Sequence, residues 1–240
     1  MLIQILTLFP EMFAGPFENS IIKRAREQKR IEFRWLNFRD FTTDKHRMVD
    51  DIPYGGGSGM VLKPEPIFRC LQFAKQSAPN AYVIMFTPQG TVFDQEFAGK
   101  LAQHEHLILI CGHYEGFDER IRAWVDTELS IGDFVLTGGE LAAMVISDAV
   151  ARLIPGVLGS AESALKDSFT DNLLDYPQYT RPVEFEGMTV PEVLRSGHHA
   201  NIERWRREQA VLRTAERRPD LLQSVKLTEN ELKLLTKPEV

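Results

Sequence analysis

The stretch Leu129-Ser-Ile-Gly-Asp-Phe-Val-Leu-Thr-Gly-Gly-Glu140 decides how the rest of the chain is interpreted. A short apolar run is interrupted by a glycine at 132, resumes at 134–136, and is interrupted again at 138–139. Glycine lets the backbone bend and approach another group closely, so the pattern is typical of a bent loop. From Glu140 onward, apolar residues recur at helical spacing. A loop that joins a strand region to a helix is a usual place for a ligand pocket, although a tight connection with packing glycines explains these residues equally well.

Outward from this stretch, short apolar runs alternate with helical patterns. Strands are predicted at 2–9, 31–35, 81–86 and 107–110, and 125–130 leads into the glycine stretch. Helices are predicted at 17–29, 64–75 and 94–103, followed by the helix that begins at Glu140. This alternation predicts an α/β fold with a mainly parallel sheet that is covered by helices on both faces.

Glycine-containing segments follow or end three of the predicted strands, near 87–90, 111–116 and 130–139. In parallel sheets, ligands bind at the carboxyl ends of the strands. We therefore expect the three segments to converge on one pocket. This convergence favours a ligand site over glycines that serve packing alone.

A further glycine-rich run, Pro53-Tyr-Gly-Gly-Gly-Ser-Gly-Met60, invites comparison with phosphate-binding loops. A P-loop ends in Gly-Lys-Ser/Thr, whereas Gly59 is followed by Met-Val-Leu. A dinucleotide fingerprint needs a strand before it, and Asp51-Ile-Pro53 is a poor strand because proline cannot donate to a sheet. We interpret this run as a mobile loop on the substrate side of the pocket.

Length and composition set outer limits on the type of protein. The 240 residues are 43% hydrophobic and 26% charged, which is ordinary for one or two globular domains. The two cysteines, Cys70 and Cys111, give neither a disulfide framework nor a metal-ligand cluster, so no metal site and a cytoplasmic location are expected. The first ten residues lack the basic start and the apolar length of a signal peptide or membrane span, so no membrane partner is expected.

The composition changes after about residue 160. We expect a domain at 1–159, a flexible linker at 160–175 and a small domain at 176–240. Two Thr-x-x-Glu capping boxes, Thr189 to Glu192 and Thr228 to Glu231, predict helix starts in the last part. Because no strand pattern is recognised there, the C-terminal domain is predicted to be all helical.

The helix predicted at 201–218 lies in the most basic part of the chain. Residues 195–218 contain seven arginines against three glutamates, although the whole chain has a net charge of −6. Arginine binds phosphate through paired hydrogen bonds, so this segment is a candidate RNA contact. The alternative is a solvated helix face with ion pairs such as Glu203 with Arg207.

Several motifs occur together in a fixed order. They are Thr87-Pro-Gln-Gly90, Cys111-Gly-His-Tyr-Glu-Gly116, Ser130-Ile-Gly-Asp-Phe-Val-Leu-Thr-Gly-Gly-Glu140, Arg152-Leu-Ile-Pro-Gly156 and Asp167-Ser-Phe169, accompanied by Pro53-Tyr-Gly-Gly-Gly57, Tyr179-Thr-Arg-Pro182 and Ser196-Gly-His-His199. Any one of them is weak evidence. The ordered set, from the first strand to the last helix, resembles the bacterial TrmD-type tRNA (guanine-N1)-methyltransferases of the SPOUT class. The chain departs from that pattern at Phe86-Thr87, where a more polar pair is expected, and between Arg120 and Ser130, which is slightly short.

The resemblance implies a fold and an assembly that spacing alone does not predict. It implies a deep trefoil knot built from the three glycine loops, against the general rule that chains are not knotted. It also implies a homodimer in which the partner chain completes each pocket. The implied reaction transfers the methyl group of S-adenosyl-L-methionine to N1 of the guanosine immediately 3′ of the anticodon, in tRNAs in which another guanosine precedes it. Magnesium assistance is a further implication, although no dedicated ligand set is recognised in the sequence.

The resemblance also assigns roles to individual residues. The implied cofactor-binding residues are Thr87, Pro88, Gly112, Tyr114, Glu115, Gly116, Ile131, Gly132, Asp133, Phe134, Val135, Leu136 and Gly138. For Glu115, the plainer interpretation is a hydrogen bond that stabilises the loop.

Asp167 is the implied general base and Arg152 the implied cation near the guanine O6 atom. Guanine N1 carries a proton, and its removal leaves negative charge toward O6, so a carboxylate and a guanidinium suit the two tasks. An ordinary aspartate is a weak base, so we expect tRNA to order the segment of Asp167 over the partner's pocket and to assist it by positioning. The plainer interpretations are linker solvation for Asp167 and a helix-dipole contact for Arg152.

Other functions stay open on the sequence alone. A non-enzymatic RNA-binding protein would use the arginine-rich helix but leaves the glycine loops unexplained. Another SPOUT-class RNA methyltransferase would act at a different RNA position, and one that methylates ribose has no N1 proton for Asp167 to remove. A Rossmann-type methyltransferase is disfavoured, because no glycine-rich motif follows the first strand.

Overall fold

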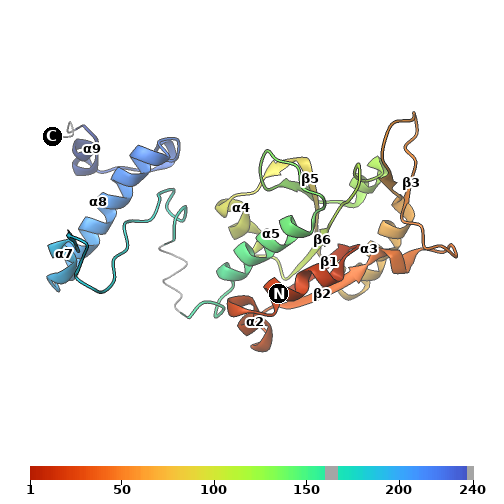
Figure 1. The fold of residues 1–240 in the computed structure, drawn as a ribbon, viewed down its shortest axis with the longest axis horizontal. Coiled ribbons are helices and arrows are strands. Elements are labelled where there is room, and N and C mark those ends of the chain that lie inside the picture. Colours follow the sequence, from red (N-terminus) through yellow and green to blue (C-terminus); the bar gives the residue numbers. More distant parts are fainter. Residues whose placement is uncertain (160–166, 237–240) are drawn as a thin grey trace. The chain divides into compact units, whose positions relative to one another are not determined.

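The computed structural model describes residues 1–159 and 167–236. They belong to two compact units, Met1–Ala161 and Glu162–Val240, and each is described by itself (Figure 1). The linker predicted at 160–175 falls in part on 160–166, which lie outside the described residues. No helix in the described ranges combines the length and the apolar character needed to cross a membrane.

The first unit is built on a parallel sheet. Within the described residues its five strands are β1 (Leu2–Thr7), β2 (Glu32–Asn37), β5 (Tyr82–Val92), β6 (His106–Ile110) and β7 (Thr127–Ser130), in the order β2-β1-β6-β5-β7. Every adjacent pair is parallel. The predicted α/β fold with a mainly parallel sheet is therefore confirmed.

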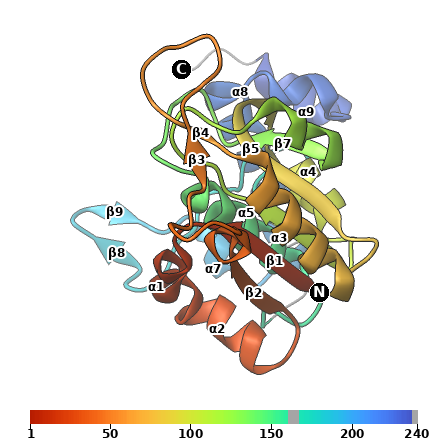
Figure 2. The same cartoon turned by 90° about the vertical axis from the view of Figure 1, so that its right-hand side faces the viewer.

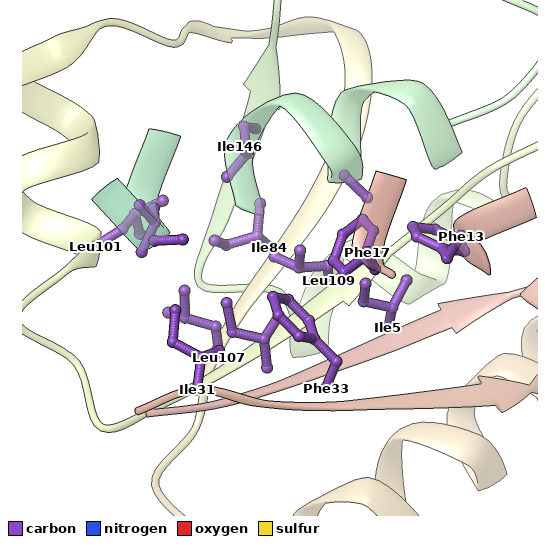
Figure 3. Packing of buried hydrophobic residues seen from close by; sticks show 14 of the residues in the cluster. Ile5, Phe13, Phe17, Ile31, Phe33, Ile84, Leu101, Leu107, Leu109 and Ile146 are labelled. Atoms are coloured by element: carbon purple, nitrogen blue, oxygen red, sulfur yellow. The ribbon is translucent and has the colours of Figure 1, made fainter. Parts of the chain in front are cut away.

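Helices cover both faces of this sheet, because successive side chains of a buried strand point to opposite faces. On one face, α2 (Ser20–Glu27), α4 (Gln95–Leu101) and α5 (Glu140–Leu153) share an apolar cluster with Ile3 and Ile5 of β1, and Figure 3 shows part of this cluster. On the other face, α3 (Pro64–Ser77) packs with Leu2 and Leu6 of the same strand. Figure 2 shows α3 alongside β1.

Shorter elements connect these strands and helices. They are η1 (Pro10–Phe13), α1 (Ala14–Phe17), η2 (Phe38–Phe41), β3 (Asp50–Asp51), β4 (Val61–Leu62) and η3 (Glu119–Trp124). The antiparallel pair β3–β4 closes the base of the glycine-rich run at 53–60. Leu62 also forms a bridge with Phe117, so this run is attached to the segment that follows β6.

The strand predicted at 81–86 is longer than expected. β5 continues to Val92, but its pairing with β7 is irregular between Phe86 and Thr91. Pro88 has no N–H to donate to a ladder. A Cβ on Gly90 would lie 2.5 Å from the carbonyl carbon of Glu128, so only glycine lets the strand return against β7. The glycine segment at 87–90 is thus an irregularity inside a strand and not a loop that ends it.

The second unit consists of helices and a short hairpin. Among its described residues, the helices are α7 (Glu192–Arg195), α8 (His199–Arg217), η4 (Leu221–Ser224) and α9 (Glu229–Leu235), and the strands are β8 (Glu184–Phe185) and β9 (Met188–Thr189). The prediction of an all-helical C-terminal domain is wrong at this hairpin. Its turn residues Glu186 and Gly187 both have positive φ, which suits a tight two-residue turn, and strands of two residues are too short to show an alternating pattern.

Of the two predicted capping boxes, the one at Thr228 is present and the one at Thr189 is not. At α9 both hydrogen bonds of the box between Thr228 and Glu231 are present. At α7 the N-cap residue is Pro191, and no side chain caps the helix. The prediction at Thr189 is wrong because this residue pairs with Glu184 in the hairpin.

A small apolar cluster stabilises the second unit around α8. Leu173 packs against Ala210 and Val211. The Leu174 N–H donates to the Thr214 hydroxyl at 2.8 Å. The chain just before the hairpin is therefore fixed on α8 by both apolar and polar contacts.

Candidate functional site

The irregular segment inside β5 and the carboxyl ends of β6 and β7 surround a pocket of about 480 Å³. Its walls come from three segments, at 86–89, 112–117 and 129–139. The predicted convergence of the glycine segments is therefore observed. All the predicted cofactor-binding residues line this pocket except Asp133, which is exposed on the same loop and lies outside the lining.

Close backbone contact explains two of the glycines. The Gly139 N–H donates to the Gly112 carbonyl at 2.9 Å, and a Cβ on Gly139 would lie 2.8 Å from the Cα of Cys111. Gly138 forms a bridge with His113, and a Cβ there would collide with the imidazole ring. The contacts that leave no space for a side chain at Gly138 and Gly139 also join two walls of the pocket. These glycines therefore serve both packing and pocket formation.

Glu140 connects the segments that contain Thr7 and His113 through its buried side chain. Its side chain is 1% exposed, accepts a hydrogen bond from the Thr7 hydroxyl at 2.6 Å, and lies 2.7 Å from His113 Nε2. Burial, together with the charge of Glu140, raises the pKa of the neighbouring Cys111 thiol well above its ordinary value. The sequence marked Glu140 only as a helix start, and no spacing pattern indicates a contact among residues 7, 113 and 140.

The glycine-rich run reaches the pocket through Glu115. The Glu115 N–H donates to the Met60 carbonyl at 3.0 Å. The Glu115 side chain lies against Gly59, whose φ of +86° and lack of space both require glycine. Because Glu115 also lines the pocket, it has the contact expected of a loop-stabilising residue and the position expected of a ligand-binding one.

Further lining residues were not assigned from the sequence. They are Phe86, Gln89, His113, Phe117, Glu119, Arg122, Leu129, Ser130, Thr137, Gly139 and Ala142. Arg122 of η3 donates to Glu119 at 2.8 Å, to Gln89 at 3.0 Å and to Glu128 of β7, so one guanidinium joins three parts of the wall. Across the described ranges, no group of three or more His, Cys, Asp and Glu side chains is arranged to hold a metal ion.

Arg152 lies at the opposite end of α5 from the pocket. The helix begins at Glu140, beside the pocket, and Arg152 is in its last turn. Twelve residues at a rise of about 1.5 Å each separate the two by about 18 Å. Arg152 therefore does not approach the pocket of its own chain.

Asp167 belongs to the second unit. It lines a hollow of about 340 Å³ together with Tyr176, Arg206 and Arg207, and its side chain is half-buried. Its carbonyl accepts the Thr170 N–H at 3.4 Å, so it begins a compact turn. Asp167 thus lines a hollow of the second unit and not the pocket of the first unit.

The arginine-rich helix combines internal ion pairs with exposed cations. Arg206 donates to Glu203 at 2.7 Å, whereas Arg207, suggested as the partner of Glu203, donates instead to Glu231 of α9 at 2.7 Å. The exposed arginines of the basic segment are Arg195, Arg204, Arg217 and Arg218. Two of these exposed arginines also form ion pairs, Arg217 with Glu216 at 3.8 Å and Arg218 with Asp220 at 2.6 Å, so both interpretations apply to this segment.

Comparison with known proteins places these features in a family. The family model described as tRNA (Guanine-1)-methyltransferase TrmD matches residues 1–224. The chain is 60% identical over 237 residues to the tRNA (guanine-N(1)-)-methyltransferase of Halalkalibacterium halodurans, covering 98% of this chain and 96% of the relative. It is 56% identical over 238 residues to the protein of that name in Desulforamulus reducens (98% and 94% covered), and 56% identical over 235 residues to that of Syntrophotalea carbinolica (98% and 95% covered). A match of this extent, over a chain in which three of the family's motifs meet at one pocket, means that the protein belongs to the TrmD family of tRNA (guanine-1)-methyltransferases.

Proposed function

We propose that this chain transfers the methyl group of S-adenosyl-L-methionine to N1 of the guanosine immediately 3′ of the anticodon, in tRNAs in which a guanosine precedes it. The observation that carries the proposal is that the family's loop motifs meet at one pocket. The similar proteins, at 56–60% identity, are named tRNA (guanine-N(1)-)-methyltransferase. The proposed site of action is the cytoplasm.

The residues at the pocket fit the methyl donor. A volume of about 480 Å³ lies within the range of small-molecule sites. Glycines at 112, 132 and 138 line the pocket together with Thr87 and Pro88, and the backbone amides and carbonyls of such loops can bind an adenine edge. Glu115 supplies an acidic group toward a cation. When bound, S-adenosyl-L-methionine supplies an electrophilic methyl group on a positively charged sulfur.

In the proposed mechanism, Asp167 accepts the N1 proton of guanine. Arg152 donates hydrogen bonds to O6, where negative charge develops as the proton leaves. Proton removal gives N1 the electron pair that attacks the methyl carbon, and the bond from that carbon to sulfur breaks. We assign no residue to magnesium.

The proposed assembly is a homodimer in which Asp167 and Arg152 act at the partner's pocket. The length of α5 supports it, because Arg152 lies about 18 Å along the helix from Glu140, at the end away from the pocket of its own chain. Leu141 and Val145, one turn apart on α5 beside the pocket, are 48% and 49% exposed, as expected of a face that a second copy covers. The proposal includes binding of tRNA by the second unit and ordering of the Asp167 segment by that tRNA.

The proposed path of the chain is the trefoil knot of the SPOUT class in the first unit, the S-adenosyl-L-methionine-binding domain. It is supported by a loop at 130–139 that leaves β7 at the sheet edge and returns to contact the segment after β6. Residues 160–175 act as the linker in this proposal, and 176–240 as the tRNA-binding domain.

Product analysis tests the reaction. Unmodified tRNA transcripts are incubated with protein and S-adenosyl-L-methionine, digested, and analysed as nucleosides by mass spectrometry. We expect 1-methylguanosine from a transcript with guanosine after the anticodon and none from the matched transcript with adenosine there. A methyl group on ribose or at another position would favour another SPOUT-class RNA methyltransferase. Binding of tRNA without transfer would favour a non-enzymatic RNA-binding protein.

A further inference from the structure

We propose that Thr7, Glu140 and His113 form a positioning network that sets the affinity of the pocket for its methyl donor without taking part in the transfer step. This inference rests on the proposed function, because it concerns the same pocket. None of the three residues was assigned a role by the family motifs.

Each oxygen of the buried carboxylate has one partner. A carboxylate removed from water is costly to bury unless its oxygens accept hydrogen bonds. Glu140 Oε1 accepts from Thr7 Oγ1 at 2.6 Å, and Oε2 lies 2.7 Å from His113 Nε2. The Thr7 oxygen itself accepts the Phe9 N–H at 2.9 Å, so its own hydrogen is directed to Glu140.

The partners come from three places that form the pocket. Thr7 ends β1, His113 follows β6, and Glu140 begins α5. The backbones of the last two segments meet where the Gly139 N–H donates to Gly112, and the Phe9 ring packs edge-on against the imidazole at 4.8 Å. One carboxylate therefore joins side chains from all three segments.

Only His113 reaches the pocket. Its side chain is 14% exposed and lines the pocket, whereas the Thr7 and Glu140 side chains lie behind the wall. The backbone at Gly138 rests directly on the imidazole. Thr7 and Glu140 are thus positioning residues that act through His113 and Gly138. Loosening them separates the walls that hold the donor and leaves the groups that handle the guanine proton unchanged.

The test uses the full-length protein and Thr7→Val, which keeps the shape and β-propensity of the side chain but removes its hydrogen bonds with Glu140 and with the Phe9 N–H. Calorimetry gives the Kd for S-adenosyl-L-methionine, and single-turnover assays give the methyl-transfer rate at saturating donor and tRNA. We expect Thr7→Val to raise the Kd about tenfold, the effect of losing one hydrogen bond to a charged group, with little change in the saturated rate. Thr7→Ser restores the hydroxyl and is expected to restore the Kd.

A matched control separates positioning from loss of stability. Thr214→Val also removes a fully buried hydroxyl, one that accepts the Leu174 N–H and donates to the Ala210 carbonyl, but in the second unit. It is expected to leave the Kd unchanged. Glu140→Gln, which keeps the shape and exchanges one acceptor for a donor, provides a second variant and is expected to raise the Kd in the same direction.

An unchanged Kd in both Thr7→Val and Glu140→Gln would overturn the inference. So would a saturated rate that falls while the Kd stays constant, or an equal rise in Kd in Thr214→Val. Failure of the wild-type protein to bind the donor at all would refute the proposed function itself. Normal donor binding by the wild-type protein and by both Thr7→Val and Glu140→Gln would refute only the positioning network.

Discussion

At the scale of single residues, the pocket depends on glycines, because the absence of their side chains lets two segments lie in close contact. Gly138 and Gly139 were visible in the sequence, but the groups they press against were not, because His113 and Cys111 lie on a different segment. The motif residues could be predicted to line one pocket because their spacing follows the strand ends. Thr7 and Arg122 could not, because they act through hydrogen bonds between segments far apart in the chain.

A Gly138→Ala substitution tests this contact. The added methyl group would collide with the His113 ring, so the two walls must separate. We expect the Kd for S-adenosyl-L-methionine, measured by calorimetry, to rise about 5- to 150-fold, since poorly accommodated methyl groups cost about 1–3 kcal/mol. Gly99→Ala is the control: it lies in α4 with open space around it, and should keep the Kd and stabilise the helix. Equal donor affinity in both variants would contradict the contact.

At the scale of elements, helices and strands with long periodic patterns were predicted well, whereas short ones were not. The parallel strands of the first unit are buried and apolar over several residues, so their pattern is visible. The β8–β9 hairpin has only two residues on each side and a nearby Thr-x-x-Glu sequence that resembles a cap. The same four-residue pattern forms a capping box at Thr228, because there a helix follows directly.

The capping box at α9 predicts a pH dependence. Burial alone would raise the pKa of Glu231, but hydrogen bonds from Thr228 and Arg207 outweigh it and hold that pKa below its ordinary value. Because the folded-state pKa is lowered, this stabilisation is fully present above the unfolded glutamate pKa, about 4.3, and is lost as the pH falls through the lower folded value. Glu231→Gln should therefore lower the free energy of unfolding by about 1 kcal/mol at neutral pH and much less in acid.

Urea unfolding followed by the fluorescence of Trp205, with the other two tryptophans replaced by phenylalanine, measures this difference. Glu229→Gln, an exposed position in the same first turn, is the matched control and should show a smaller change. A Glu231→Gln effect that stays constant from neutral pH to strong acid would contradict the assignment.

At the scale of the whole molecule, the sheet and the two units follow from composition and periodicity, whereas the assembly does not. Periodicity places helices on both faces of a parallel sheet, as observed. The periodicity of the sequence contains no information on how Arg152 and Asp167 reach a pocket, because in the proposed assembly that pocket belongs to a second chain. Only the resemblance to a family supplied that expectation.

Subunit mixing tests the proposed assembly. Asp167→Ala and a pocket-blocking Gly138→Trp variant are each expected to be inactive alone. A mixed dimer contains one intact pocket, on the Asp167→Ala chain, completed by Asp167 of the other chain. Co-expression with two affinity tags should therefore yield mixed dimers with about half the wild-type methyl-transfer rate, because one site of two is complete. Mixed dimers that remain inactive would show that Asp167 acts within its own chain.

The central claim is that the irregular segment of β5 and the loops after β6 and β7 hold the methyl donor. A crystal structure of the protein with S-adenosylhomocysteine tests it most directly. We predict density for the ligand between Thr87, Gly112 and Gly138, with the adenine edge against the backbone of the segment 131–138. Ligand density in a different place, for example in the hollow beside α8, with the pocket of the first unit left without ligand at saturating concentration, would contradict the account.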